Sequence, residues 1–134
     1  MIDQEKIKKA MASIIQAIGE DYRREGLVDT PNRIAQMYDE LFSGLDQNPS
    51  HVLSTSFEEG HDEMVVLKEI PFFSMCEHHF LPFYGSASIG YIPSGRVVGA
   101  SKLAMALDIL ARRPQLQERL TRQLADTIFD AMQP

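Results

Sequence analysis

The feature that most constrains the fold of this chain is a change in hydrophobic period, from helical spacing to strand-like runs and back again. Near the N-terminus, apolar residues recur at three- and four-residue intervals after Asp3, which predicts an amphipathic helix over about 4–19. Asp29 is a capping residue followed closely by Pro31, and the apolar stripe after them predicts a second helix that ends at Gly44.

The centre of the chain is rich in β-forming residues. Turn-forming residues without a sustained period predict a long loop over 45–62. The runs at 64–73 and 84–92 predict two antiparallel strands. Helical spacing returns over 103–110, and Pro114 is predicted to open a further helix.

These elements together predict an α+β fold in which helices pack on one face of a small antiparallel sheet. We expect a helical region and loop over 1–62 and a sheet-containing region over 63–134, within one domain overall. Two strands alone leave two open edges, and a stable protein must cover or pair such edges. The pattern therefore predicts a homo-oligomer.

Composition excludes several classes of protein. No apolar run reaches the length of a membrane span, and the first residues lack the features of a signal peptide, so the sequence predicts a cytoplasmic protein without a membrane partner. A single cysteine, Cys76, cannot form an internal disulfide and fits a reducing compartment. The net charge of -6 argues against nucleic-acid polymers as partners, because that binding requires many phosphates to be neutralised together. One mononucleotide needs only a few positive groups in one pocket.

Residues 76–79 read Cys-Glu-His-His and form the strongest candidate site. The Cys-x-x-His spacing allows Cys76 and His79 to bind one zinc ion. Adjacent histidines point in different directions in regular backbone, so His78 is left to face a substrate as a catalytic residue. A catalytic zinc usually has three protein ligands, and the sequence provides only two convincing ones here.

A structural interpretation of the same residues stays open. Cys76 can be a buried small apolar residue, with the two histidines as ordinary polar loop residues. His51 and His61 lie in the predicted loop without partners nearby in the sequence, and we assign no metal to either.

Candidate anion-binding residues lie at the starts of predicted helices. Ser101 and Lys102 stand where free backbone N–H groups favour a phosphate, although Ser101 can equally act only as a cap. Arg33, in the first turn of the second helix, is similarly ambiguous. Gln117 and Glu118 open the last helix, where an acid stabilises the N-terminus and can also accept hydrogen bonds from the N–H edge of guanine.

Several ordered motifs resemble those of one enzyme family across most of the chain. They lie at 26–33, 62–64, 74–80, 90–93, 101–103 and 112–120, and include Ser-Met-Cys-Glu-His-His-Phe at 74–80. Together these segments resemble GTP cyclohydrolase I. The resemblance implies a tunnelling fold, ring-shaped homo-oligomers with active sites shared between subunits, and conversion of GTP to 7,8-dihydroneopterin triphosphate and formate. That product enters pterin biosynthesis, including the routes to tetrahydrofolate, biopterin and deazaguanines, among which the residues do not choose.

The resemblance also implies roles for single residues. The positions of Cys76 and His79 bind zinc, which activates the water that attacks C8 of guanine, and the position of His78 assists proton transfer. By the same matching, Gln117 and Glu118 hold the guanine.

The remaining matched positions, Ser101, Lys102 and Arg33, face ribose or triphosphate according to the resemblance. The chain departs from the family pattern at Met105, where the family usually has an arginine, and a thioether cannot bind phosphate as a guanidinium does. The resemblance further places a catalytic histidine, a second zinc-binding cysteine and a phosphate-binding arginine beyond the position of Pro134. On that basis we expect partial zinc binding and slow release of formate.

Two other interpretations are left open by the sequence. One is a non-catalytic member of the family that binds a nucleotide or a pterin. The other is a fragment of a longer enzyme.

Overall fold

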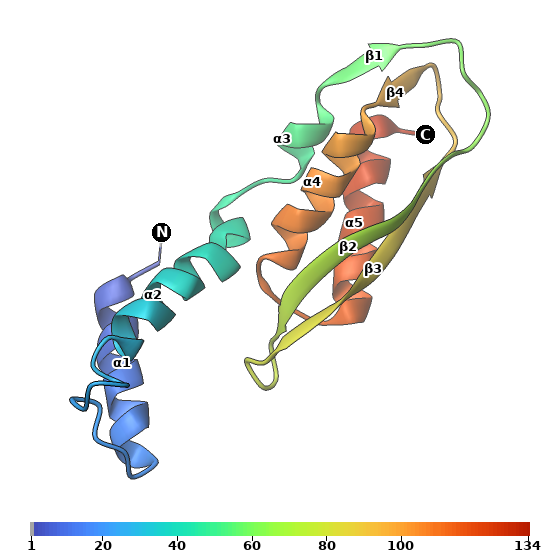
Figure 1. The fold of residues 1–134 in the computed structure, drawn as a ribbon. Helices are drawn as coiled ribbons and strands as arrows, with labels where there is room; N and C mark the ends of the chain where they lie inside the picture. The colour runs from blue at the N-terminus through green and yellow to red at the C-terminus, as the bar shows by residue number, and fades with distance from the viewer. Residues whose placement is uncertain (1) are drawn as a thin grey trace. The chain divides into compact units, whose positions relative to one another are not determined.

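The structure is a computed structural model that describes residues 2–134, and its helices and strands fall into two compact units. One unit ends at Ser43 and the other comprises Gly44–Pro134 (Figure 1). Residues 44–62, which the sequence assigned to the N-terminal region, therefore group with the sheet-containing unit.

The first unit contains both predicted N-terminal helices. Helix α1 is Gln4–Ala17, and the side chain of Asp3 caps it by accepting a hydrogen bond from the Lys6 N–H at 3.0 Å. Helix α2 is Thr30–Leu41, with Asp29 as its N-cap residue and a proline in its first turn. The structure ends α2 at Leu41 rather than at the glycine predicted to stop it.

The stretch predicted as a long loop instead contains short elements, so that prediction was wrong. They are the 3-10 helix η1 (Ser43–Asp46), helix α3 (Ser50–Leu53) and strand β1 (Ser56–Glu58). The Asn48 side chain accepts a hydrogen bond from the Ser50 N–H at 3.0 Å at the start of α3, and Leu53 is fully buried. Leu53 belongs to the core and Val52 packs against it, and a helix of this length is too short to show a period.

Two predicted strands form the long antiparallel hairpin of the second unit. Strand β2 is Val65–Cys76 and strand β3 is Pro82–Tyr91. Strand β2 continues through Cys76, so the polar segment interrupts the strand pattern later than predicted. A separate strand, β4 (Arg96–Val98), pairs antiparallel with β1.

The prediction that Pro114 opens a helix was wrong, because Pro114–Gln115 forms strand β5. This strand runs parallel to β2, which gives a mixed sheet of order β3-β2-β5. The Gln115 side chain is 1% exposed, and its Nε2 donates to Leu110 O at 3.0 Å and to Gln123 Oε1 at 2.8 Å. Buried hydrogen bonds of this kind hold the segment extended, and helix α5 (Gln117–Met132) begins only afterwards.

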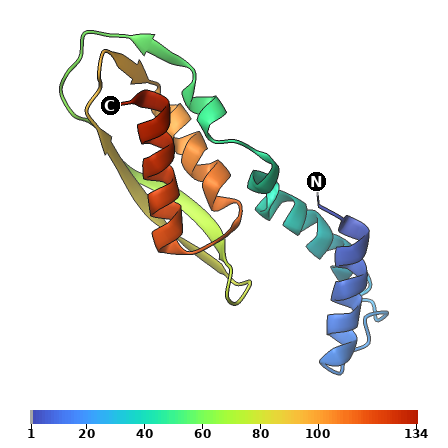
Figure 2. The same ribbon diagram turned by 180° about the vertical axis from the view of Figure 1, so that it is seen from behind.

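Helix α4 (Ala100–Ala111) and helix α5 pack on one face of the β2–β3 hairpin (Figures 1 and 2). Their apolar stripes build the core with residues from the sheet, including Ile70, Ile89 and Leu107. The hydroxyl of buried Ser74 in β2 donates to Ala111 O at 2.6 Å, which ties the last turn of α4 to the sheet. The α+β fold with helices on one face of a small sheet is confirmed.

Candidate metal and nucleotide site

The candidate site begins at a tight turn between β2 and β3. The Cys76 N–H donates to Leu81 O at 2.8 Å, and the Phe80 N–H donates to Cys76 O at 2.8 Å. Phe80 adopts a positive φ of 54°, which allows the chain to reverse. The turn has its own hydrogen bonds, and it places the side chains of residues 76–79 together at the end of the hairpin.

Cys76 and His79 are brought together by this turn. The distance between Cys76 Sγ and His79 Nδ1 is 3.6 Å. The contact with His79, together with backbone N–H groups of His78 and His79, lowers the pKa of the Cys76 thiol below its usual value. The thiolate, which is the form that binds metals, therefore forms at a lower pH than in an ordinary cysteine.

The pair fits the geometry of zinc. A tetrahedral zinc with its ordinary bonds to sulfur and nitrogen separates the two ligand atoms by about 3.6 Å, the separation found for Cys76 Sγ and His79 Nδ1. Across residues 2–134 no cluster of three or more histidine, cysteine or acidic side chains is poised to hold a metal, so this pair provides two ligands. His51 lies in α3 and His61 precedes β2, and neither belongs to such a cluster.

His78 and His79 have different surroundings. Their rings lie 6.3 Å apart and nearly perpendicular, at 86°. His78 Nε2 lies 3.9 Å from Glu77 Oε1, whereas His79 faces Cys76. His78 is exposed, so its ring is accessible to a substrate.

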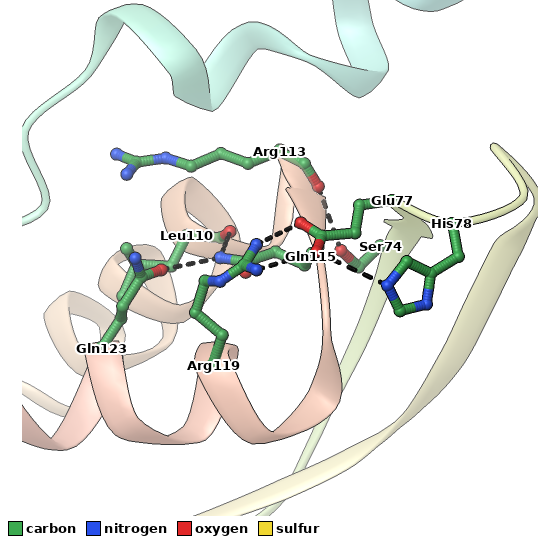
Figure 3. Close-up of polar contacts among 8 residues, drawn as sticks. All are labelled: Ser74, Glu77, His78, Leu110, Arg113, Gln115, Arg119 and Gln123. Atoms are coloured by element: carbon green, nitrogen blue, oxygen red, sulfur yellow. Dashed lines mark hydrogen bonds and ion pairs between the residues drawn. The ribbon is translucent and has the colours of Figure 1, made fainter.

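Sequence reasoning assigned no contact to Glu77 or to Arg119, and the structure joins them (Figure 3). Arg119 Nη2 donates to Glu77 Oε1 at 2.8 Å, and Arg119 Nη1 donates to Glu77 Oε2. This bidentate contact lowers the pKa of Glu77 and raises the pKa of Arg119. No local pattern could reveal a pair 42 residues apart in the sequence.

The pairing of β5 with β2 brings the start of α5, with Gln117 and Glu118, near the turn. Cys76 pairs with Gln115 in the parallel ladder, and α5 starts two residues later at Gln117. Both Gln117 and Glu118 are exposed, and no side chain caps the first turn of α5. Gln117 also lines one part of an apolar cavity of about 480 Å³ between β3 and α5. The start of α5 therefore lies close along the chain to Gln115, the residue that pairs with Cys76.

Ser101 and Lys102 occupy a different place. They lie in the first turn of α4, whose N-cap is Gly99 without a side-chain hydrogen bond, so Ser101 does not cap the helix. The opposite end of α4, at Ala111, is the end that contacts Ser74 in β2 beside the turn. A helix rises 1.5 Å per residue, so Ser101 lies about 15 Å along the axis from Ala111. Within one chain, Ser101 and Lys102 therefore lie away from Cys76.

Arg33 and Met105 lie in different units of the structure. Arg33 belongs to the first unit, where its guanidinium lies 3.7 Å from the Asp29 carboxylate and both side chains are exposed. Met105 lies on α4 with its side chain partly exposed.

Comparison with known families identifies the chain. The family profile of GTP cyclohydrolase I matches residues 7–134. The chain belongs to the GTP cyclohydrolase I family.

Individual relatives of this GTP cyclohydrolase I family member are named GTP cyclohydrolase 1. GTP cyclohydrolase 1 of Halalkalibacterium halodurans is 55% identical over 134 residues, which are 99% of this chain and 71% of that protein. GTP cyclohydrolase 1 of Dehalococcoides mccartyi is 58% identical, over 98% of this chain and 71% of that protein. GTP cyclohydrolase 1 of Carboxydothermus hydrogenoformans is 57% identical, over 100% of this chain and 70% of that protein.

This GTP cyclohydrolase I family member therefore has an enzymatic, GTP cyclohydrolase I-like function, and the non-catalytic alternative is not favoured. None of the helices described for residues 2–134 has the length and apolar content that a membrane crossing requires.

Proposed function

We propose that this chain opens the guanine ring of GTP by hydrolysis and gives 7,8-dihydroneopterin triphosphate and formate. The observation that carries the proposal is the Cys76–His79 pair, 3.6 Å apart, at a turn beside the start of α5. Thiol and imidazole are zinc-binding groups, and this pair supports a metal site near the start of the helix that carries Gln117 and Glu118. A cytoplasmic location would keep the Cys76 thiol reduced and able to bind metal.

Cys76 and His79 would hold the zinc ion. When bound, zinc supplies a Lewis acid that brings the pKa of water close to about 7. His78 does not face Cys76, and its exposed ring is free to move a proton to or from the substrate. The two neighbouring histidines thereby divide metal binding and proton transfer between them.

Guanine recognition is proposed for the start of α5. The Glu118 carboxylate can accept two hydrogen bonds from the N–H edge of guanine, and the Gln117 carboxamide can both donate and accept. Neither side chain is buried, so both can reach a ligand.

Phosphate recognition is proposed for Ser101, Lys102 and Arg33. The start of α4 has no side-chain cap and presents the positive end of the helix dipole beside the Lys102 ammonium. Because Ser101 lies at the far end of α4 from the turn, we propose that the phosphates contact α4 of a second copy of this chain.

A homo-oligomer, with a ring as the proposed arrangement, is supported by the sheet. Strand β3 spans Pro82–Tyr91 and lies at an edge of the described sheet, next to β2 alone. A long unpaired edge favours pairing with another chain. Large side chains near it are exposed, and Tyr84 is the most exposed at 88%. Burial of this surface against a second copy would shield both the edge and these side chains.

The experiment is to measure GTP binding by calorimetry and formate release on one zinc-supplemented sample. Glu118→Ala removes the proposed guanine acceptor, and we expect it to weaken GTP binding by about tenfold or more, because a charged hydrogen bond contributes about 1.5–3 kcal/mol. Asp126→Ala is the control, since Asp126 is an exposed acid in the middle of the same helix. Equal GTP affinity of the two variants would contradict the guanine assignment.

A further inference from the structure

Glu77 and Arg119 form the one two-pronged side-chain ion pair found near the candidate site among the described residues. Their side chains are 27% and 41% exposed, so the pair is partly shielded from water. Arginine presents its donors in a planar fork that matches both oxygens of a carboxylate, and such a contact fixes direction as well as distance.

The pair joins two parts of the site that lie far apart in the sequence. Glu77 stands inside the turn that carries Cys76, His78 and His79, and Arg119 stands in the first turn of α5 directly after Glu118. The backbone also links the two parts, through the pairing of β2 with β5 and the hydrogen bond from the Glu77 N–H to Gln115 O at 3.1 Å. These backbone links hold the start of the turn at Cys76 and Glu77, and the two-pronged contact adds a side-chain link from Glu77 to α5 (Figure 3).

We propose that Glu77 and Arg119 are positioning residues, which hold the turn with Cys76, His78 and His79 at a fixed place relative to the start of α5. The inference rests on the proposed function insofar as it names the turn as the metal end and α5 as the guanine end of one site. Their mutual placement decides whether the reacting carbon of guanine meets the activated water.

The internal geometry of each part does not depend on the pair. The turn is closed by the hydrogen bonds between Cys76 and Leu81 and between Phe80 and Cys76. Gln117 and Glu118 both lie on α5, so their spacing is set by that helix. Loss of the pair should therefore leave zinc content and the KM for GTP near their wild-type values while kcat falls.

The test compares Arg119→Gln with Arg122→Gln, a matched control on α5 whose guanidinium lies 3.6 Å from Asp126 and is largely exposed. We expect kcat for formate release to fall by about 10- to 100-fold in Arg119→Gln, the usual effect of removing a residue that orients a metal ligand. Order parameters from NMR relaxation report the turn directly and need neither zinc nor GTP. We expect them to fall at residues 77–79 in Arg119→Gln and to stay near about 0.85, the value of rigid backbone, in Arg122→Gln.

A second variant makes the result decisive. Glu77→Gln keeps the shape of the side chain and removes its charge. It should reproduce both the fall in kcat and the fall in the order parameters. It replaces Arg119→Gln if that variant does not fold. The double variant should be no worse than either single one, because each already breaks the pair. Unchanged kcat and unchanged order parameters, or losses that add in the double variant, would overturn the proposal. If the wild type releases no formate, the proposed function fails, and the order parameters alone still decide whether the pair positions the turn.

Discussion

Cys76 shows how a single contact changes the chemistry of a side chain. Its Sγ lies 3.6 Å from His79 Nδ1, and that contact is the largest cause of its lowered thiol pKa. A lowered pKa means that the thiolate forms at a lower pH than in an ordinary cysteine, whose pKa is about 8.5. Metal binding requires the same deprotonated form.

This chemistry gives a prediction for metal-free protein. The rate of Cys76 alkylation by iodoacetamide should rise with a midpoint pH below that of a free cysteine, because the thiolate is the reactive species. His79→Gln removes the largest cause of the shift and should raise the midpoint towards the free value. Alkylation followed by mass spectrometry over a pH series provides the measurement. A midpoint unchanged by His79→Gln would show that the contact does not stabilise the thiolate.

Local spacing was sufficient to predict some site residues and not others. Cys76 and His79 are three residues apart, so one turn can join them, and the sequence predicted that pair. Glu77 and Arg119 meet only because β5 runs beside β2, and parallel pairing of distant segments leaves no periodic signal in the sequence. Tertiary pairing therefore determines the part of the site that spacing could not predict.

At the scale of elements, long periodic segments were predictable and short ones were not. Helices α1, α2 and α4 show apolar stripes, and all of them were predicted. Strands β1, β4 and β5 have two or three residues each, too few to show alternation. Pro114 suits both a helix start and the first residue of a strand, and the contact with β2 decides for the strand.

One junction between elements gives a sharp stability prediction. Gly44 in η1 lies against the end of α4, and a Cβ on it would come within 1.9 Å of Ile109 O. Gly44→Ala must therefore displace backbone, and we expect it to lower the free energy of unfolding by about 1–3 kcal/mol. The measurement is urea denaturation followed by circular dichroism.

Gly60→Ala is the matched control for this substitution. A Cβ at Gly60 meets no atom within 4 Å, so the change should stay within about 0.5 kcal/mol. Equal stability of the two alanine variants would contradict the close approach of η1 to α4.

At the scale of the whole molecule, the residues of the proposed site lie near opposite ends of α4. The turn with His79 lies near its C-terminal end, and Lys102 lies in its first turn, about 14 Å along the axis from Ala111 by the rise of the helix. We propose that one nucleotide engages the two groups from separate copies of the chain. The free edge of β3 provides a surface through which copies can associate.

This division predicts complementation between inactive variants. His79→Ala and Lys102→Ala should each lose formate release, because each removes a residue that every site requires. Chains that carry one lesion each, mixed by co-expression, should regain activity at about a quarter of their sites if each site takes its two halves from different copies. Light scattering after size exclusion should show an oligomer in all samples. No recovery in mixed oligomers would contradict a shared site.

The most direct test of the account is formate release from GTP measured together with zinc content, for the wild type and Cys76→Ala. We predict that zinc-supplemented wild type releases formate from GTP. Cys76→Ala should lose both zinc and formate release, because one of the two ligands found at the turn is removed. Formate release that persists in Cys76→Ala, or its absence from zinc-loaded wild type, would contradict the account.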